Sequence, residues 1–213
     1  ICSGLVGSEM CIRDRAIVEH PKISAISFTG GTATGKIVAA TAAPMFKKLS
    51  LELGGKNATI ILDDADLSIA AQGAARAAFT NSGQVCLCGS RILVADAIYD
   101  EFVEKLVSEV SNMTVGNPQL TDTDIGSVIS QEHMNKILSY IDLAANEHGR
   151  ILTGGKQLSL PKPNADGAFI APTLIDRIPI DSRCATEEIF GPVATIHRFS
   201  SDEEAIDLSL IHI

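Results

Sequence analysis

Tryptophan is absent from this sequence, and aromatic side chains of any kind are few. Aromatic residues make up 4% of the 213 residues, whereas 46% are hydrophobic. This composition does not fit a β-sandwich built around large aromatic residues; it fits an α/β core of Ala, Ile, Leu and Val. The length suffices for one full domain or for parts of two.

Positive charge and cysteine are also scarce. Asp and Glu (26) outnumber Lys and Arg (17), which gives a formal net charge of −9. Nothing therefore predicts binding to nucleic acid or to an anionic membrane surface. No apolar run is long enough to span a bilayer. Five cysteines are too few, and oddly numbered, for a disulfide scaffold, which predicts reduced thiols and a cytoplasmic location.

The two ends of the sequence differ from the rest. Residues 1–15 have no cationic start followed by an apolar core, so they do not read as a secretory signal. Both this segment and residues 209–213 resemble translated sequencing-adapter read-through, and we expect both to be non-native. The remaining chain, residues 16–208, is expected to begin and end inside domains.

Short β-prone runs alternate with helical patterns along the chain, which indicates an α/β architecture with a largely parallel sheet. Thr32 is the expected N-cap of the first helix. The acidic residues 63–66 are expected to cap the second helix rather than to bind a metal. The expected strands are 24–29, 49–53, 58–62, 90–95, 151–152, 169–175 and 193–199, and the expected helices are 33–43, 67–79, 97–112 and 131–148.

Two segments carry the residues with the clearest chemical potential. Segment 50–56, Ser-Leu-Glu-Leu-Gly-Gly-Lys, places the carboxylate of Glu52 at the end of an apolar run. Segment 81–91, Asn-Ser-Gly-Gln-Val-Cys-Leu-Cys-Gly-Ser-Arg, places the thiol of Cys86 in a loop of small residues. A Cys nucleophile and a Glu base are a standard pair for chemistry through a thioester. Taken singly, a buried structural thiol and a solvated strand-end carboxylate are the open alternatives.

Together the two segments resemble the aldehyde dehydrogenase superfamily. Glu-Leu-Gly-Gly-Lys is similar to its glutamate motif, and Gly-Gln-Val-Cys followed by Ser-Arg is similar to its cysteine motif. The resemblance extends from about residue 16 to about residue 208. It implies that residues 16–54 form the C-terminal part of a Rossmann-like NAD(P)-binding domain. Residues 55–208 would then form most of a parallel-sheet α/β catalytic domain.

The resemblance also implies a role for each of the two residues. Cys86 would attack the aldehyde carbonyl to give a thiohemiacetal, and hydride transfer to the nicotinamide would leave a thioester. Only a thiolate is nucleophilic, so the site must favour that form. Glu52 would activate the water that hydrolyses the thioester. Superfamily members that pass the acyl group to coenzyme A typically lack this glutamate, so its presence favours release of a free acid.

Segment 28–35, Phe-Thr-Gly-Gly-Thr-Ala-Thr-Gly, resembles the family's cofactor-phosphate turn. Gly30, Gly31 and Gly35 would let the backbone and a helix N-terminus approach the pyrophosphate. An ordinary β-to-α turn is the alternative for this segment taken alone. Many family members have Ser where this chain has Gly31, so a side-chain contact to the phosphate is not expected here.

A third block, Glu-Glu-Ile-Phe-Gly-Pro at residues 187–192, resembles the family segment at the nicotinamide end of the cofactor. By this resemblance Glu188 binds the nicotinamide ribose and Phe190 packs near the nicotinamide ring. Leu53 and Gly54 are expected at the same end. The implied cofactor is NAD, with NADP left open, and the implied partner is a small-molecule aldehyde. The parent protein is expected to be a homodimer or homotetramer.

The other Cys and His residues are expected to be structural. Cys88 and Cys184 are expected to pack in the core, because Cys-Leu-Cys is neither a redox Cys-x-x-Cys nor half of a zinc site. Four histidines, on helices or strand edges, lack metal spacing and are expected to be solvated or locally hydrogen-bonded. They are His20, His133, His148 and His197.

The segments around Cys86, Leu158 and Cys184 look like those of the 2-aminomuconic and 2-hydroxymuconic semialdehyde dehydrogenases. Those enzymes act on acidic, unsaturated aldehydes. Two other readings remain open: a non-enzymatic relative with the same fold, and a truncated reading frame without a function of its own. The 213-residue chain by itself is expected to be inactive, because the adenosine pocket and the oxyanion-hole asparagine of the family are expected to lie upstream.

Overall fold

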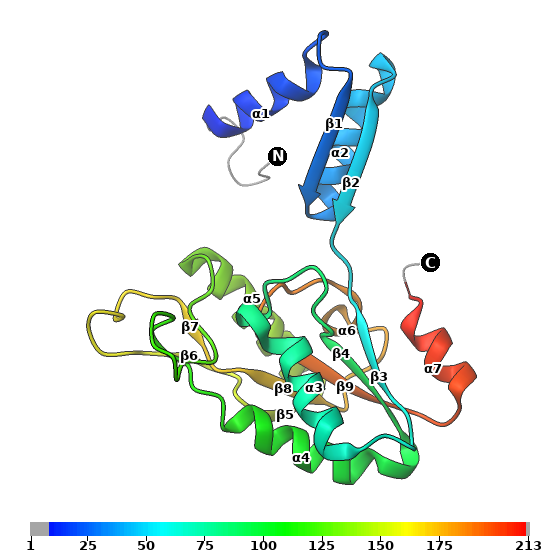
Figure 1. Ribbon diagram of the computed structural model, residues 1–213, viewed down its shortest axis with the longest axis vertical. Coiled ribbons are helices and arrows are strands. Elements are labelled where there is room, and N and C mark those ends of the chain that lie inside the picture. Colours follow the sequence, from blue (N-terminus) through cyan, green and yellow to red (C-terminus); the bar gives the residue numbers. More distant parts are fainter. Residues whose placement is uncertain (1–8, 212–213) are drawn as a thin grey trace. The chain divides into compact units, whose positions relative to one another are not determined.

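The structure is a computed structural model that describes residues 9–211, with side chains described from residue 14 onward. It divides into two compact units, one ending at Gly55 and the other beginning at Lys56 (Figure 1). Residues 1–8, part of the segment expected to be non-native, lie outside the described residues, whereas residues 9–15 belong to the first helix.

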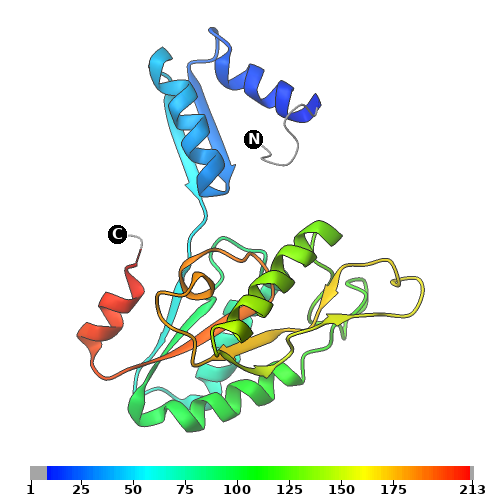
Figure 2. The ribbon, with the colours of Figure 1, turned by 180° about the vertical axis from the view of Figure 1, so that it is seen from behind.

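The first unit is a strand–helix–strand motif with an additional N-terminal helix. Its strands pair in parallel, with Thr29 opposite Glu52 and Gly30 opposite Leu53. Helix α2 covers one face of this pair (Figure 2), and Val38 forms a small core with apolar residues of the neighbouring helix and strands. The elements are α1 (Glu9–Glu19), β1 (Ala25–Gly30), α2 (Thr32–Ala42), the 3-10 turn η1 (Ala43–Met45) and β2 (Lys48–Leu53).

One expectation about this unit is wrong. The N-cap of α2 is Gly31, in an extended conformation, and no side chain bonds to the free N–H groups of the first turn. Thr32 already lies inside the helix, where its Oγ1 donates to the carbonyl of Gly54 at 3.4 Å. The strand reaches Gly30 and the helix starts two residues later, so only Gly31 is left to serve as the cap.

The second unit contains a five-stranded sheet with strand order β3-β4-β9-β8-β5. Three of its four pairings are parallel, and only β5 runs antiparallel to its neighbour β8. The largely parallel α/β sheet expected from the sequence is therefore confirmed. Its strands are β3 (Ala58–Ile61), β4 (Arg91–Ala95), β5 (Arg150–Thr153), β8 (Thr173–Asp176) and β9 (Val193–Phe199).

Two separate cores lie on the two faces of this sheet. Helices α3 and α4 pack on one face with Leu174 and Ala194, and α5 packs on the other with Ile175 and Val193. Neighbouring residues of β8 and β9 thus divide between the cores, as the two-residue period of a strand requires. The helices are α3 (Leu67–Phe79), α4 (Tyr99–Ser111), α5 (Gln131–Asn146), α6 (Arg183–Thr186) and α7 (Asp202–Ser209), with 3-10 turns η2 (Thr80–Gly83) and η3 (Asp96–Ile98).

Helix α3 is capped as predicted from the acidic residues that precede it. Asp66 is the N-cap, and its Oδ1 accepts hydrogen bonds from the backbone N–H groups of Ser68 and Ile69 at 3.0 and 3.1 Å. A carboxylate at this position satisfies free N–H groups and complements the helix dipole. The capping interpretation of residues 63–66 is confirmed.

The expected strand 169–175 is in fact two strands in different sheets. Phe169–Ile170 (β7) pairs with a two-residue strand, β6 (Gln157–Leu158), which the sequence did not reveal. Thr173–Asp176 (β8) belongs to the five-stranded sheet. Pro172 lies between them, and a proline has no N–H with which to continue a ladder. The run is mostly apolar because both strands are buried.

Candidate active site

The loop that carries Cys86 begins with an unusual turn. Asn81, Ser82 and Gly83 all have positive φ values, of 53°, 57° and 69°, a conformation that is costly for residues with a Cβ atom. The hydroxyl of Ser82 donates to the carbonyl of Gly126 at 3.0 Å and helps to hold the turn. A Cβ atom on Gly83 would lie 2.0 Å from the carbonyl oxygen of Gly191. Only glycine fits there, and the turn is locked against the segment 187–192.

Cys86 itself is exposed, although the loop around it is fixed. The side-chain amide of Asn57 donates to the carbonyl of Cys86 at 2.6 Å. The side-chain amide of Asn81 donates to the carbonyl of Gln84, and the Gln84 side chain accepts from the backbone N–H of Ile129 at 3.0 Å. The structure therefore presents this thiol to solvent on a loop that is hydrogen-bonded to two other segments, at Asn57 and Ile129.

The other two described cysteines are buried, as expected. Cys88 is 8% exposed, and burial raises the pKa of its thiol. Cys184 is fully buried and its thiol donates to the carbonyl of Tyr140 at 3.1 Å; burial raises its pKa as well. Both groups are held in the unreactive thiol form. Cys86 is thus the exposed cysteine among the residues whose side chains are described, from residue 14 onward.

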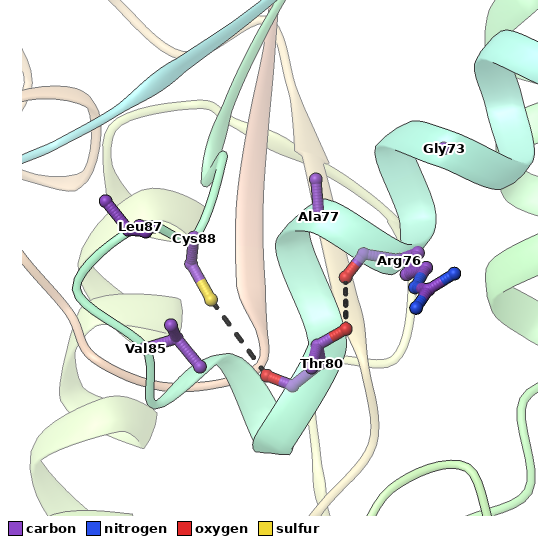
Figure 3. Close-up of a pocket in the computed structure, with 7 residues that line it drawn as sticks. All are labelled: Gly73, Arg76, Ala77, Thr80, Val85, Leu87 and Cys88. Carbon is purple, nitrogen blue, oxygen red and sulfur yellow. Dashed lines mark hydrogen bonds between the residues drawn. The ribbon is translucent and has the colours of Figure 1, made fainter.

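A pocket adjoins the Cys86 loop. It has a volume of about 290 Å³ and is lined by residues of the C-terminal half of α3 and by the loop residues on either side of Cys86 (Figure 3). Its lining consists of Gly73, Arg76, Ala77, Thr80, Val85, Leu87 and Cys88. Cys86 itself is not among the lining residues, but its two sequence neighbours, Val85 and Leu87, are.

Glu187, the first residue of the segment 187–192, is hydrogen-bonded to other side chains of the second unit. Arg183 forms two hydrogen bonds of 2.9 Å to the Glu187 carboxylate, and the hydroxyl of Tyr140 donates to it at 2.6 Å. These contacts lower the pKa of Glu187 to about 2. Glu187 therefore anchors the segment to α5 and α6.

Phe190 has a strained backbone and a partly exposed side chain. Its φ is 59°, and 37% of the residue is exposed. A ring nitrogen of His133, Nε2, lies 2.6 Å from the Phe190 carbonyl oxygen, and the two rings meet edge to face. Because Gly191 touches Gly83, the structure brings Phe190 and the Cys86 loop into neighbouring positions within the second unit.

Lys56 is a buried charge that the sequence reasoning missed. It is 2% exposed, and its Nζ has no hydrogen-bond partner among the described residues. Its pKa is lowered to about 8, mainly by burial; the neighbouring Cys184 and Glu188 act to raise the pKa and the charge of Arg91 acts to lower it. The only sequence cue was a lysine directly after the two glycines of segment 50–56.

In the first unit, the expected cofactor residues meet at the carboxyl ends of the two strands. Gly30 and Leu53 are paired neighbours, and a Cβ on Gly35 would lie 2.5 Å from the Leu53 side chain. Gly31 has open space around it, and no side chain of the described residues makes a capping hydrogen bond at the N-terminus of α2. Carboxyl ends of parallel strands beside a free helix N-terminus are a typical anion and cofactor site.

Glu52 is an exposed residue on β2, one position before Leu53. It belongs to the first unit, whereas Cys86 belongs to the second. A direct pairing of the two residues therefore remains a prediction from their motifs.

The described histidines do not gather with other ligands. Among the residues of the described part, no group of three His, Cys, Asp or Glu side chains could hold a metal ion. His197 lies on β9, inside the sheet rather than at its edge; its Nε2 lies 3.0 Å from Thr195 Oγ1, and burial lowers its pKa to about 4. No helix within the described range is long and apolar enough to cross a membrane.

The model of the family described as "Aldehyde dehydrogenase family" matches residues 5–209, nearly the whole chain. The chain belongs to the aldehyde dehydrogenase family. The resemblance found in the glutamate and cysteine motifs is thereby confirmed, and so is the fold class. The match starts within the segment expected to be non-native.

Similar proteins include several enzymes named for semialdehydes and for betaine aldehyde. The chain is 46% identical over 193 residues to 2-aminomuconic semialdehyde dehydrogenase of Mus musculus, covering 90% of this chain and 40% of that protein. It is 41% identical over 204 residues to betaine aldehyde dehydrogenase of Bacillus subtilis, covering 96% and 40%. The chain thus spans about two-fifths of the length of these relatives.

A similar solved structure supports the same family assignment. Betaine aldehyde dehydrogenase from Staphylococcus aureus, in complex with NAD+, superposes with a TM-score of 0.87 at 42% identity. The alignment covers 92% of this chain and 39% of that one. The aldehyde dehydrogenase fold of the described chain is therefore established.

Proposed function

We propose that this chain supplies the nucleophile, the deacylating base and the nicotinamide side of the cofactor site of an NAD-dependent aldehyde dehydrogenase. The observation that supports this most strongly is the contrast between three thiols. Cys86 is exposed on a tied loop, whereas Cys88 and Cys184 are buried with raised pKa values. In a family whose chemistry runs through cysteine, that contrast selects Cys86.

Cys86 forms the covalent bond to substrate in this mechanism. Its thiolate attacks the aldehyde carbon, the C–S bond forms, and the carbonyl oxygen becomes an oxyanion. That carbon then loses hydride and becomes a thioester carbonyl. Glu52 takes a proton from water, the resulting hydroxide attacks the thioester, and the C–S bond breaks to release a carboxylic acid and the thiolate. The fixed loop supports these steps because it holds the thiol in one place.

The first unit fits the cofactor assigned to it. Bound NAD would accept the hydride. The open backbone at Gly31 and the free N–H groups of the α2 N-terminus would bind the pyrophosphate, and Gly30, Gly35, Leu53 and Gly54 would shape the adjoining surface. Glu188 would hold the nicotinamide ribose and Phe190 would pack near its ring. We propose NAD rather than NADP as this cofactor, because the similar structure from Staphylococcus aureus was solved with NAD+.

The proposed substrates are aldehydes that carry a distal carboxylate, such as muconic semialdehydes. This follows from relatives named for 2-aminomuconic and 2-hydroxymuconic semialdehyde, at 46% and 40% identity. A relative named for betaine aldehyde, at 41% identity, supports a different substrate. A betaine-type substrate carries a positive charge instead of a negative one, so the two possibilities predict opposite charge preferences.

Steady-state oxidation by the complete protein tests the proposal. NADH formation would be measured with an aldehyde bearing a distal carboxylate, a neutral aldehyde of equal length and a trimethylammonium aldehyde. We expect kcat/KM to be about 10- to 100-fold higher for the carboxylated aldehyde, because a site built to pair a charge is left unpaired by the neutral analogue. Equal values for all three aldehydes, or a preference for the cation, would contradict the substrate assignment.

A further inference from the structure

The pocket beside Cys86 has one charged side chain in its described lining. Arg76 is exposed on α3, and the other lining residues are Gly, Ala, Thr, Val, Leu and Cys. None of the ion pairs identified within residues 9–211 involves Arg76. The pocket therefore combines a mostly apolar wall with a single available cation.

Thr80 contacts two other residues that line this pocket. The hydroxyl of Thr80 donates to the carbonyl of Arg76 at 2.6 Å, and the thiol of Cys88 lies 4.0 Å from the carbonyl of Thr80 (Figure 3). The opposite wall is formed by Val85 and Leu87, which are the two sequence neighbours of Cys86. A molecule bound in the pocket therefore contacts the two residues that flank Cys86 in the sequence.

An arginine in this position suits a carboxylate better than any neutral group. The guanidinium is planar, keeps its charge at all relevant pH values and can donate two parallel hydrogen bonds to one carboxylate. Val85, Leu87 and Ala77 offer apolar contact to the hydrocarbon between that carboxylate and a reacting aldehyde. Burial of the hydrocarbon and pairing of the charge would both orient the carbonyl toward the thiol.

We propose that Arg76 is the specificity-determining residue that binds the distal carboxylate of the aldehyde. This rests on the proposed function in one respect: the reacting group at Cys86 is taken to be an aldehyde. The anion site itself follows from the pocket, the position of Arg76 and the position of Cys86.

Three variants of the complete protein test the assignment by kinetics. Arg76→Gln removes the charge, Arg76→Lys keeps it without the planar fork, and Lys105→Gln removes a charge from α4, outside the pocket lining. We expect Arg76→Gln to lower kcat/KM about tenfold for the carboxylated aldehyde and less than about twofold for the neutral one, since a charged hydrogen bond at an exposed site contributes at the lower end of its usual range. The kcat/KM of Arg76→Lys for the carboxylated aldehyde should lie between those of Arg76→Gln and the unaltered protein. Lys105→Gln should have the same kcat/KM as the unaltered protein.

A second measurement does not depend on aldehyde oxidation. The rates at which iodoacetate and iodoacetamide alkylate Cys86 are compared; in both reactions a C–S bond forms and iodide leaves. Arg76 should speed the reaction of the anionic reagent only, so Arg76→Gln should lower the iodoacetate-to-iodoacetamide ratio severalfold while Lys105→Gln leaves it unchanged. Salt should reduce the ratio in the unaltered protein.

The outcomes separate this inference from the proposed function. An unchanged alkylation ratio and an unchanged aldehyde preference in Arg76→Gln would overturn the role of Arg76, even with a fully active dehydrogenase. Equal losses for carboxylated and neutral aldehydes would also overturn it, because a structural defect would do the same. If the unaltered protein oxidised no aldehyde but its alkylation ratio still fell in Arg76→Gln, the proposed function would fail and the anion site would stand.

Discussion

Cys86→Ala should abolish aldehyde-dependent NADH formation by the complete protein, lowering kcat by roughly 10⁴-fold or more. Alanine has no nucleophile with which to form the thiohemiacetal, and the remaining site cannot divide the reaction into two easier steps. The side chain is exposed, so its loss leaves no cavity and should change the thermal unfolding midpoint little. Steady-state rates and a thermal melt on the same preparation provide the test.

Cys88→Ala is the matched control, two residues along the same loop. Its thiol is buried and has a raised pKa, so it contributes packing rather than reactivity. The variant should keep most of the activity, with a loss of stability on the order of 1 kcal/mol for the removed sulfur. Activity retained in Cys86→Ala and lost in Cys88→Ala would show that the nucleophile had been misassigned.

Glu52→Gln should have the second-largest effect, and its time course should be distinctive. Glutamine keeps the size and the hydrogen-bonding groups of glutamate but cannot take a proton from water. The thioester should still form, which gives one equivalent of NADH in a rapid phase, and deacylation should then slow by roughly 10²- to 10⁴-fold. Stopped-flow absorbance at high enzyme concentration would resolve the two phases.

Two results would contradict this role for Glu52. Unchanged steady-state turnover would show that another group activates the water. Loss of the rapid phase as well would show that the carboxylate acts before hydride transfer, for example on the Cys86 thiol. Glu104→Gln provides a control, because it makes the same change on α4, away from the motif.

Local patterns in the sequence predicted most of the fold. Five apolar residues of α4 recur with the period of a helix, and they are the buried ones: Tyr99, Phe102, Val103, Leu106 and Val110. The observed bounds of most helices and strands agree with the expected ones within two residues. These features depend on hydrophobic period and on capping, which are local in the chain.

The failures come from contacts between residues far apart in sequence. Nothing near Pro172 shows that the segments on its two sides enter different sheets. The fit of Gly83 against Gly191 could not be foreseen either, since it joins positions more than a hundred residues apart. The burial of Lys56 likewise depends on elements distant in the chain. A sequence pattern reports which face is apolar but not what covers it.

In the candidate site, too, local features could be predicted from the sequence and long-range contacts could not. The motifs singled out Cys86, and its exposure and tied loop agree with that choice. Arg76 could not be selected from sequence, because an arginine on an amphipathic helix is normally a solvated surface charge. Its importance rests on the pocket that α3 forms with the loop, which is a tertiary feature.

The covalent intermediate provides the most direct test of the central claim. Complete protein carrying Glu52→Gln would be mixed with NAD+ and a carboxylated aldehyde, quenched in acid during the stalled phase, digested and analysed by mass spectrometry. The prediction is one acyl group, with the mass of the aldehyde less one hydrogen, on the peptide sulfur of Cys86. An acyl group on Cys88 or Cys184, or NADH formation without any acylated cysteine, would contradict the proposed mechanism.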